Sequence, residues 1–281
     1  MTFSFSVTLL VLLAAVFHAS WNAMVKVEPD RFIAIALIHG TAGVMGAVLV
    51  LLAPPLAPEA WWYLGPSIAT QLLYSSILVQ TYRIGDLSQV YPLARGTAPA
   101  AVVLLSLWLL GDTLPWNKLA GVVAISLGIV SLAWHRDLLS HGRWKPVALA
   151  VTNGVVIASY TLMDGRGVRL SHSPIAYGGW LFLCFGLPWI PALLLYPPAR
   201  RRRWEPHWAW LMVAGGGLCC AAYLFVVWAL SFQSAAPVSA LRETSVIFAA
   251  LLGSLLLKEP FGLRRVIASA VVAAGVLLIS L

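Results

Sequence analysis

Long apolar blocks dominate this sequence of 281 residues. Short breaks that carry Pro, Gly or charged residues separate the blocks. An α-helix needs roughly 20 apolar residues to cross a bilayer, whereas the strands of a membrane barrel would alternate apolar and polar residues. The sequence therefore predicts an all-α membrane protein with ten transmembrane helices. The expected helices are Thr8–Met24, Phe32–Leu52, Trp61–Thr81, Gln89–Leu110, Leu119–Trp134, Val147–Met163, Ile175–Leu195, Trp208–Ala229, Ala236–Leu257 and Val266–Leu281.

The balance of residue types excludes an ordinary soluble domain. Hydrophobic residues make up 60% of the chain and charged residues only 10%, against about 25% charged residues in a typical soluble protein. The formal charge of +8 does not indicate nucleic-acid binding, because membrane proteins collect Lys and Arg in their loops. The three cysteines all lie in apolar blocks at spacings that match no metal site, so we expect neither a metal nor a cofactor.

The chain contains an internal repeat. A shift of 147 positions places Arg95-Gly96-Thr97 on Arg242-Glu243-Thr244, Asp112 on Glu259 and Gly128 on Gly275. Near the start of each half, the stretch 18–26 aligns with 157–165, which pairs Trp21 with Tyr160. Five helices per repeat is an odd number, so the second repeat must enter the membrane from the opposite side. We therefore expect two inverted five-helix repeats, residues 1–137 and 138–281, as in transporters that bind substrate near the midplane.

The basic residues in the breaks are distributed unequally. Of the 18 Lys and Arg residues, 13 lie in odd-numbered breaks and three in even-numbered ones, the other two being Arg95 and Arg242. Basic residues favour the cytoplasmic side of short loops, so this count places the odd-numbered breaks in the cytoplasm and both termini outside.

Motifs at the ends of the two halves resemble a known family. The stretches LLGDTLPWNKLAG and LLLKEPFGLRRVIAS, together with ALRETSVIFAALLG, are similar to the EamA-type branch of the drug/metabolite transporter (DMT) superfamily. The resemblance implies a secondary carrier or exporter of small polar metabolites, located in the bacterial cytoplasmic (inner) membrane. It also implies that both termini lie in the cytoplasm, opposite to the distribution of basic residues.

Two arginines, Arg95 and Arg242, are the strongest candidates for substrate binding. Each lies inside an apolar block, where a charged side chain costs roughly 2.5–3.5 kcal/mol and usually faces a partner or a wet cavity. We expect them on opposite sides of the midplane, roughly 10–15 Å apart along the membrane normal at 1.5 Å per residue. Two guanidinium groups on one cavity would attract a carboxylate or phosphate. The alternative is structural, with Glu243 reaching across to neutralise Arg95.

We interpret Glu243 as the only acidic residue that lies deep inside an apolar block. Buried carboxylates in carriers commonly exchange protons, whereas two nearby arginines would keep the carboxylate ionised. Proton coupling through Glu243 and a salt bridge therefore both remain open. Besides substrate and lipid, the expected partners include protons or a counter-substrate.

Polar and aromatic residues near the arginines complete the expected binding site. His18 and Asn22 are four residues apart and share a helix face, with Trp21 beside them. Tyr91 lies one turn before the first arginine, and Tyr160 is the repeat mate of Trp21. His18 would serve either as a titrating group or as one side of an interhelical hydrogen bond.

These features together predict a secondary active transporter that moves a small polar, anionic metabolite by alternating access. The main alternative is an exporter of amino acids or amphipathic compounds in which the arginines are only structural, and a lipid-linked flippase is another. The sequence carries no HExxH or GxSxG motif and no paired catalytic aspartates, so an enzyme is not expected.

Overall fold

The computed structural model describes residues 5–28, 30–84, 87–111, 113–133, 144–201, 205–257 and 263–281. These residues are almost entirely helical, and no strand occurs among them. The helices are α1 (Phe5–Val27), α2 (Arg31–Leu52), η1 (Pro58–Ala60), α3 (Trp61–Ile84), α4 (Leu87–Leu105), η2 (Ser106–Leu110), α5 (Trp116–Ala133), α6 (Trp144–Ser171), α7 (Pro174–Gly186), α8 (Trp189–Leu195), α9 (Pro197–Arg201), α10 (Pro206–Leu230), α11 (Ala235–Glu243), α12 (Ser245–Leu257) and α13 (Leu263–Ser280).

Every expected apolar segment falls on a helix or on two consecutive helices. The seventh segment is split into α7 and α8, and the ninth into α11 and α12. The fourth segment ends in the π-helical turn η2. The sixth segment was predicted to end too early, at Met163, because α6 continues to Ser171. The expected all-α class is confirmed, while Asp112 and Glu259 of the repeat lie outside the described residues.

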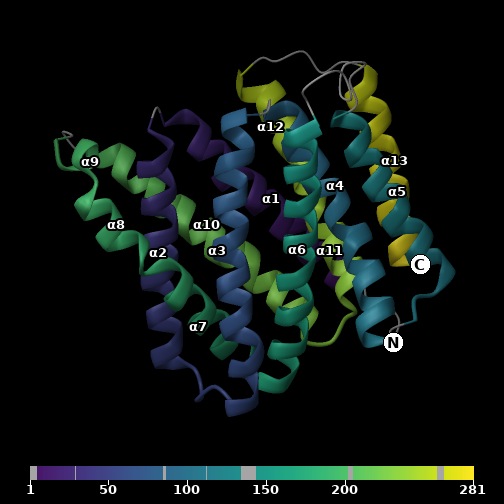
Figure 1. Cartoon of the computed structure of the whole chain (residues 1–281), viewed down its shortest axis with the longest axis horizontal. Coiled ribbons are helices and arrows are strands. Elements are labelled where there is room, and N and C mark those ends of the chain that lie inside the picture. The colour runs from purple at the N-terminus through teal and green to yellow at the C-terminus, as the bar shows by residue number, and fades with distance from the viewer. Residues whose placement is uncertain are drawn as a thin grey trace.

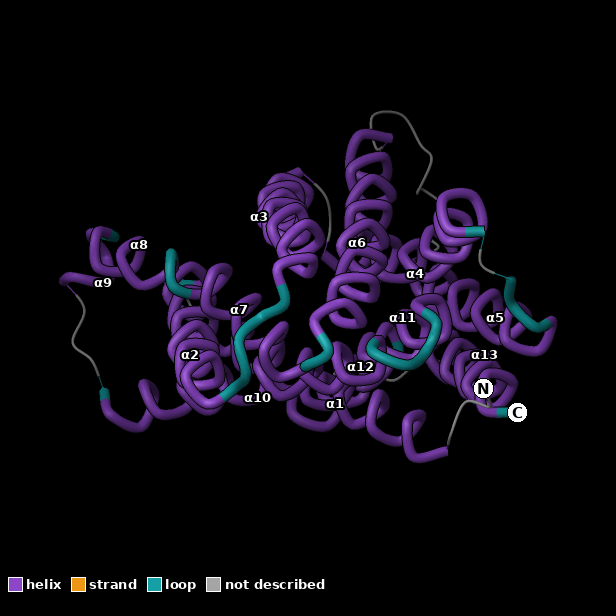
Figure 2. The backbone as a smooth tube through the Cα atoms, turned by 90° about the horizontal axis from the view of Figure 1, so that it is seen from below, coloured by secondary structure: helices purple, strands orange, loops and turns teal. Residues whose placement is uncertain are grey.

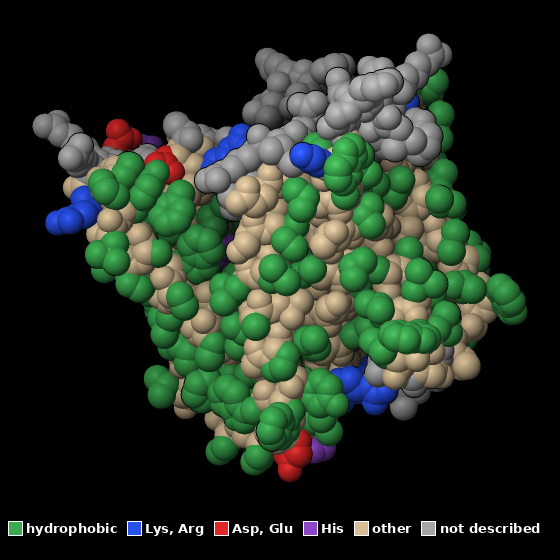
Figure 3. All heavy atoms as spheres, viewed as in Figure 1, with side chains coloured by type: hydrophobic (Ala, Val, Ile, Leu, Met, Phe, Trp, Pro, Cys, Tyr) green, Lys and Arg blue, Asp and Glu red, His purple; other side chains and the backbone are tan. Residues whose placement is uncertain are grey.

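The helical surface is that of a membrane protein. Among the described residues, six helical stretches are long and apolar enough to cross a bilayer: Phe5–Val25, Arg31–Leu52, Val90–Leu109, Trp144–Ser171, Pro174–Leu195 and His207–Leu230. Two shorter apolar helices, Trp116–Leu132 and Val266–Ser280, accompany them. In Figure 3 the charged side chains gather toward the upper and lower ends of the visible face, and a largely hydrophobic band lies between them. Such a band matches a lipid environment.

Local sequence sets several of the helix ends. Asp30 caps α2, because its carboxylate accepts hydrogen bonds from the amide groups of Phe32 and Ile33. Ser173 caps α7 in the same way, followed by a proline at the first helical position. Gly111 ends η2 with φ of 64°, a left-handed conformation that suits glycine.

The packing brings helices from the two halves of the chain together. Helix α5 packs on α13, α2 on α7, α1 on α10, and both α3 and α4 on α6. The first and last helices meet near the chain ends, where the hydroxyl groups of Thr8 and Ser280 are 3.3 Å apart; both ends are seen close together in Figures 1 and 2. The largest helix–helix contacts therefore join one half of the chain to the other.

Glycines allow α2 and α7 to approach each other closely. A Cβ atom added at Gly186 would lie 2.5 Å from the Cα atom of Gly43. At Gly46 it would lie 2.5 Å from the backbone nitrogen of Leu183. Close backbone contact through small residues is how helices associate tightly inside a bilayer, where apolar burial supplies no driving force.

Candidate substrate-binding site

The two arginines lie on helices whose regular hydrogen bonding is interrupted. Helix α11 ends at Glu243, and Thr244 separates it from α12. The Thr244 hydroxyl donates to the carbonyl of Leu241 at 2.6 Å. On α4, Pro92 and Pro99 lie within the helix on either side of Arg95. Because proline has no amide hydrogen, Pro99 leaves the Arg95 carbonyl without its usual helical donor.

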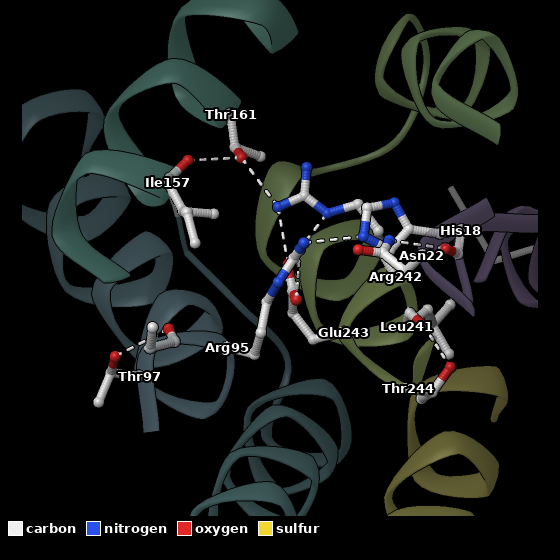
Figure 4. Close-up of polar contacts among 11 residues, drawn as sticks. His18, Asn22, Arg95, Thr97, Ile157, Thr161, Leu241, Arg242, Glu243 and Thr244 are labelled. Atoms are coloured by element: carbon white, nitrogen blue, oxygen red, sulfur yellow. Dashed lines mark hydrogen bonds and ion pairs between the residues drawn. The ribbon is translucent and has the colours of Figure 1, made fainter. Parts of the chain in front are cut away.

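Glu243 lies at the centre of a buried group of charges (Figure 4). Its Oε2 accepts a hydrogen bond from Nη1 of Arg95 at 2.9 Å. Its Oε1 accepts from Nε and Nη2 of Arg242, at 3.0 and 2.8 Å. Relative exposures are 5% for Arg95, 3% for Arg242 and 0% for Glu243. One carboxylate thus pairs with both arginines, which is the ion pair that the sequence offered as the structural alternative.

His18 is the fourth member of this group. Its Nε2 lies 2.8 Å from Nη2 of Arg95. Arginine only donates hydrogen bonds, so Nε2 must accept and the imidazole must be neutral, with its proton on Nδ1. We call Arg95, Arg242, Glu243 and His18 the arginine cluster. Two guanidinium groups against one carboxylate leave it with one positive charge in excess.

The charged groups of the two arginines lie much closer together than the sequence led us to expect. Roughly 10–15 Å was expected along the membrane normal from 1.5 Å per residue. Both guanidinium groups instead reach opposite oxygens of the same carboxylate. Long arginine side chains extend several ångströms from their helices, so a position along the helix does not fix where the charge lies.

The other expected site residues lie around the cluster with different roles. The Tyr91 ring lies 5.3 Å from Cζ of Arg95, and the Tyr160 ring lies 5.7 Å from Cζ of Arg242. Both distances suit cation–π contact. Asn22 instead donates to a backbone carbonyl of its own helix at 2.7 Å. Trp21 touches the His18 ring edge-on at 5.0 Å between centroids, and its buried Nε1 has no hydrogen-bond partner among the described residues.

Two polar residues of α6 were missing from the expected site. The Thr161 hydroxyl lies 3.4 Å from Nη2 of Arg242 and donates to a backbone carbonyl of α6 at 2.7 Å. One turn further along, Asp164 is completely buried. The interpretation of Glu243 as the only deep acidic residue is therefore wrong.

Asp164 is held by three hydroxyl groups from three other helices. Ser67 of α3 donates to its Oδ1 at 2.5 Å, and Tyr177 of α7 donates to the same oxygen at 2.8 Å. Tyr223 of α10 donates to Oδ2. We call these three residues the hydroxyl cage. Gln71 extends it by donating to the Ser67 hydroxyl at 3.1 Å.

The sequence around Asp164 concealed its position. It is followed by Gly165, Arg166, Gly167 and, two positions later, Arg169, a pattern that reads as a loop. In the structure Arg166 is exposed. Arg169 donates to the backbone carbonyl of Leu230, the last residue of α10, at 3.1 Å and to that of Gln233, just after the helix, at 2.5 Å. Gly167 provides space for Tyr177, whose ring a Cβ atom there would approach to 2.5 Å. The spacing of Tyr160, Thr161 and Asp164 on one helix face was the available signal.

Comparison with known proteins agrees with this architecture. Residues 144–281 match the EamA-like transporter family. Through this half, the chain belongs to the EamA-like transporter family. A crystal structure described only as that of a protein superposes with a TM-score of 0.71 at 19% sequence identity, and the match covers 98% of this chain and 96% of the other. At that identity the likeness shows the fold alone. A search of curated proteins returned no match.

The EamA-like half contains Arg242, Glu243 and Asp164, whereas Arg95 and His18 lie before residue 144. Family membership establishes a multi-pass membrane transporter. The arginine cluster therefore joins the EamA-like half to the rest of the chain, because Glu243 and Arg95 meet across 148 positions of sequence.

Proposed function

We propose that this EamA-like transporter is a secondary active carrier of a small, polar, anionic metabolite in the bacterial cytoplasmic membrane. The observation that carries the proposal is the arginine cluster, in which two buried guanidinium groups share one carboxylate. The excess positive charge favours an anion, and guanidinium groups bind carboxylates or phosphates in bidentate fashion. The indole N–H of Trp21, which has no hydrogen-bond partner in the described part of the chain, offers a further donor next to His18.

We further propose ten transmembrane helices in two inverted repeats, residues 1–137 and 138–281. Contacts between α5 and α13 support this arrangement. A Cβ atom at Gly275 would meet Gly121 and Ile125, and one at Gly128 would meet Ala268 and Val272. The shift of 147 positions converts the first set of contacts into the second. The shift of 147 positions, which was found by aligning Arg95 with Arg242, therefore also relates the contacts between α5 and α13.

The proposed mechanism is alternating access around the arginine cluster. Transporters of this type bind substrate near the midplane, where helices are discontinuous. The break at Thr244 between α11 and α12 and the prolines of α4 supply such discontinuities next to the charges. Because the arginines are almost completely buried, substrate must gain access through movement of one half against the other. Its carboxylate or phosphate would then compete with Glu243 for the guanidinium groups.

A second candidate is an exporter of amino acids or amphipathic compounds, for which the same cluster is structural. It is favoured by the observation that both arginines already have partners: Glu243 for both, His18 for Arg95 and Thr161 for Arg242. A lipid-linked flippase would likewise need no free guanidinium group. These candidates differ in whether an anion binds.

Ligand-dependent thermal stability of the purified transporter separates the candidates. The panel contains phosphate, methylphosphonate, a sugar phosphate, lactate, methanesulfonate and neutral amino acids. A ligand at 100 times its Kd stabilises the folded state by about 2.7 kcal/mol. The test variants are Arg95→Gln and Arg242→Gln, with Arg95→Lys retaining the charge if the neutral variant does not fold. Arg166→Gln is the matched control, because Arg166 is exposed on α6.

An anion should raise the unfolding temperature of the wild type and of Arg166→Gln, but not of the two cluster variants. In liposomes that contain the wild type, the same anion should be transported across the membrane. Stabilisation by neutral amino acids alone would refute the anionic substrate and support the exporter. Equal anion binding by wild type and Arg95→Gln would show that Arg95 is structural.

A further inference from the structure

Asp164 is a buried carboxyl group whose described hydrogen-bond partners carry no charge. The hydroxyl cage supplies three donors, two to Oδ1 and one to Oδ2. The side chain has no exposed surface, and a buried carboxyl group is normally paired with a cation or becomes protonated. The cage is therefore suited to a group that changes its protonation state.

The surroundings of Glu243 are of the opposite kind. Its oxygens face two guanidinium groups, which only donate hydrogen bonds and remain charged. A proton on Glu243 would have no acceptor there and would face two positive charges. Hydroxyl groups both donate and accept, so Ser67 or Tyr177 can receive a hydrogen bond from a protonated Asp164 after rotation of the hydroxyl. The cage therefore accommodates both forms of the carboxyl group, and the arginine cluster only one form.

We propose that Asp164 is the proton-binding site of this transporter, and that the proton and the anionic substrate bind together. The inference rests on the proposed anion-carrier function. With Asp164 ionised, Arg95 and Arg242 are balanced by two carboxylates, and the interior is neutral. Protonation of Asp164 leaves one excess positive charge, which a monovalent anion then neutralises. Proton and anion thus increase each other's affinity by the same factor.

Arg242 connects the two sites. It pairs with Glu243, and its Nη2 lies 3.4 Å from the hydroxyl group of Thr161, which is one turn from Asp164 on α6. The ring of Tyr160 lies near Arg242, and Tyr160 belongs to the buried apolar cluster against which Tyr223 of the cage packs. A change of charge at Asp164 is therefore felt at the guanidinium group that would bind the substrate.

The elements packed on α6 carry further titratable and charged groups. They include Tyr74 on α3, Tyr91 and Arg95 on α4, Tyr177 on α7, Tyr223 on α10, Arg242 and Glu243 on α11, the exposed Glu59 of η1, and Tyr160, Arg166 and Arg169 on α6 itself. Among these groups, Tyr177 and Tyr223 donate hydrogen bonds to the Asp164 carboxyl group.

The cage lies near one end of the helix bundle. Asp164 and Tyr223 are each seven residues from the C-terminal ends of α6 and α10, or about 10 Å at 1.5 Å per residue. Tyr177 is in the first turn of α7. A proton therefore reaches the cage from the edge formed by the α2–α3, α6–α7 and α10–α11 connections, which face the viewer in Figure 2.

Infrared difference spectroscopy tests the proton site without any ligand. Acidification of the wild type over the range from about pH 9 to pH 5 should produce the carbonyl stretch of a protonated, buried carboxylic acid. The band should be absent in Asp164→Asn and retained in Glu59→Gln, the matched control at an exposed carboxylate. Tyr177→Phe, which removes one donor, should alter the band while leaving Asp164 in place. A band that persists in Asp164→Asn, or no band in the wild type, would overturn the proposal.

Binding of methanesulfonate and lactate tests the coupling, because neither changes charge over this range. Wild-type affinity should rise on acidification by about tenfold, for unit charges about 10 Å apart at an effective dielectric constant of about 20. In Asp164→Asn the affinity should be high and independent of pH. If the affinity of the wild type for these anions does not change with pH, the coupling between proton and anion is refuted, while the proton site at Asp164 is not affected. If no anion binds while the Asp164 band is present, the anion-carrier function fails and the proton site stands.

Discussion

Replacement of Glu243 by Gln should be among the most destabilising single changes in this protein. The substitution removes the negative charge that pairs with Arg95 and Arg242 while keeping the side-chain volume. The new amide group must also direct its NH₂ toward one of the two guanidinium groups, which have no acceptor to offer. Removing one partner of a buried ion pair costs about 3–5 kcal/mol, because the other charge stays buried without compensation.

This loss should be visible as a fall in unfolding temperature of roughly 6–20 °C, given about 2–4 °C per kcal/mol for chains of this size class. The assay is thermal unfolding in detergent, followed by the fluorescence of the 13 tryptophans. Glu59→Gln makes the same chemical change at an exposed position on η1 and should leave the transition within about 0.5 kcal/mol of the wild type.

A double-mutant cycle then tests the ion pair itself. Removing Arg95 together with Glu243 eliminates one of the two uncompensated charges, so Arg95→Gln/Glu243→Gln should be less destabilised than the sum of the single variants. Residues in direct contact typically show coupling of about 0.5–3 kcal/mol. Additive effects, or a Glu243→Gln transition equal to that of Glu59→Gln, would refute the buried three-charge arrangement.

Two further predictions concern the scaffold. Gly186→Ala should destabilise by about 1–3 kcal/mol, because the new methyl group would lie 2.5 Å from the Cα atom of Gly43; Gly65→Ala, with no atom within 4 Å of the added Cβ, should be neutral or stabilising in the same unfolding assay. Asp30→Ala should cost about 1 kcal/mol and speed amide exchange in the first turn of α2, because it removes the cap; Asp30→Ser should retain most of the protection, and equal exchange in both variants would contradict the capping role.

The sequence predicted which charged residues form the arginine cluster, but it did not predict how they are arranged. Arg95, Arg242 and Glu243 stand out as charges in apolar blocks, and the contact between Arg95 and Glu243 was one of the two alternatives that the sequence left open. The pairing of both arginines with one carboxylate was not, because it depends on the break after Glu243 and on side-chain reach. Apolar periodicity fixes where a helix lies but carries no information about such local departures.

Asp164 shows a different limit of sequence reasoning. Glycines and arginines usually end an apolar segment, and here they belong to a helix that continues to Ser171. Tertiary contacts explain this: Gly167 makes room for Tyr177, and Arg169 caps the end of α10. Tyr177 belongs to the next helix, and the carbonyl groups that Arg169 binds are more than 60 residues further along the chain, so neither contact follows from the residues around Asp164 alone. The helix extension, once known, turns an apparent loop residue into a buried carboxyl group.

The glycine contacts between α5 and α13 also have a mechanical consequence. Backbone atoms meet there without space for a methyl group at Gly121, Gly128 or Gly275. Such a seam resists sliding, since a shift of one residue would drive side chains into backbone, but it tolerates a small change of angle. In a transporter whose halves rock, this seam would act as the fulcrum. Residues near it would move little, and displacements would grow toward the opposite side of the bundle, where α2 and α7 to α9 lie (Figure 1). There α2 and α7 would move together, because their own glycine contacts hold them to each other.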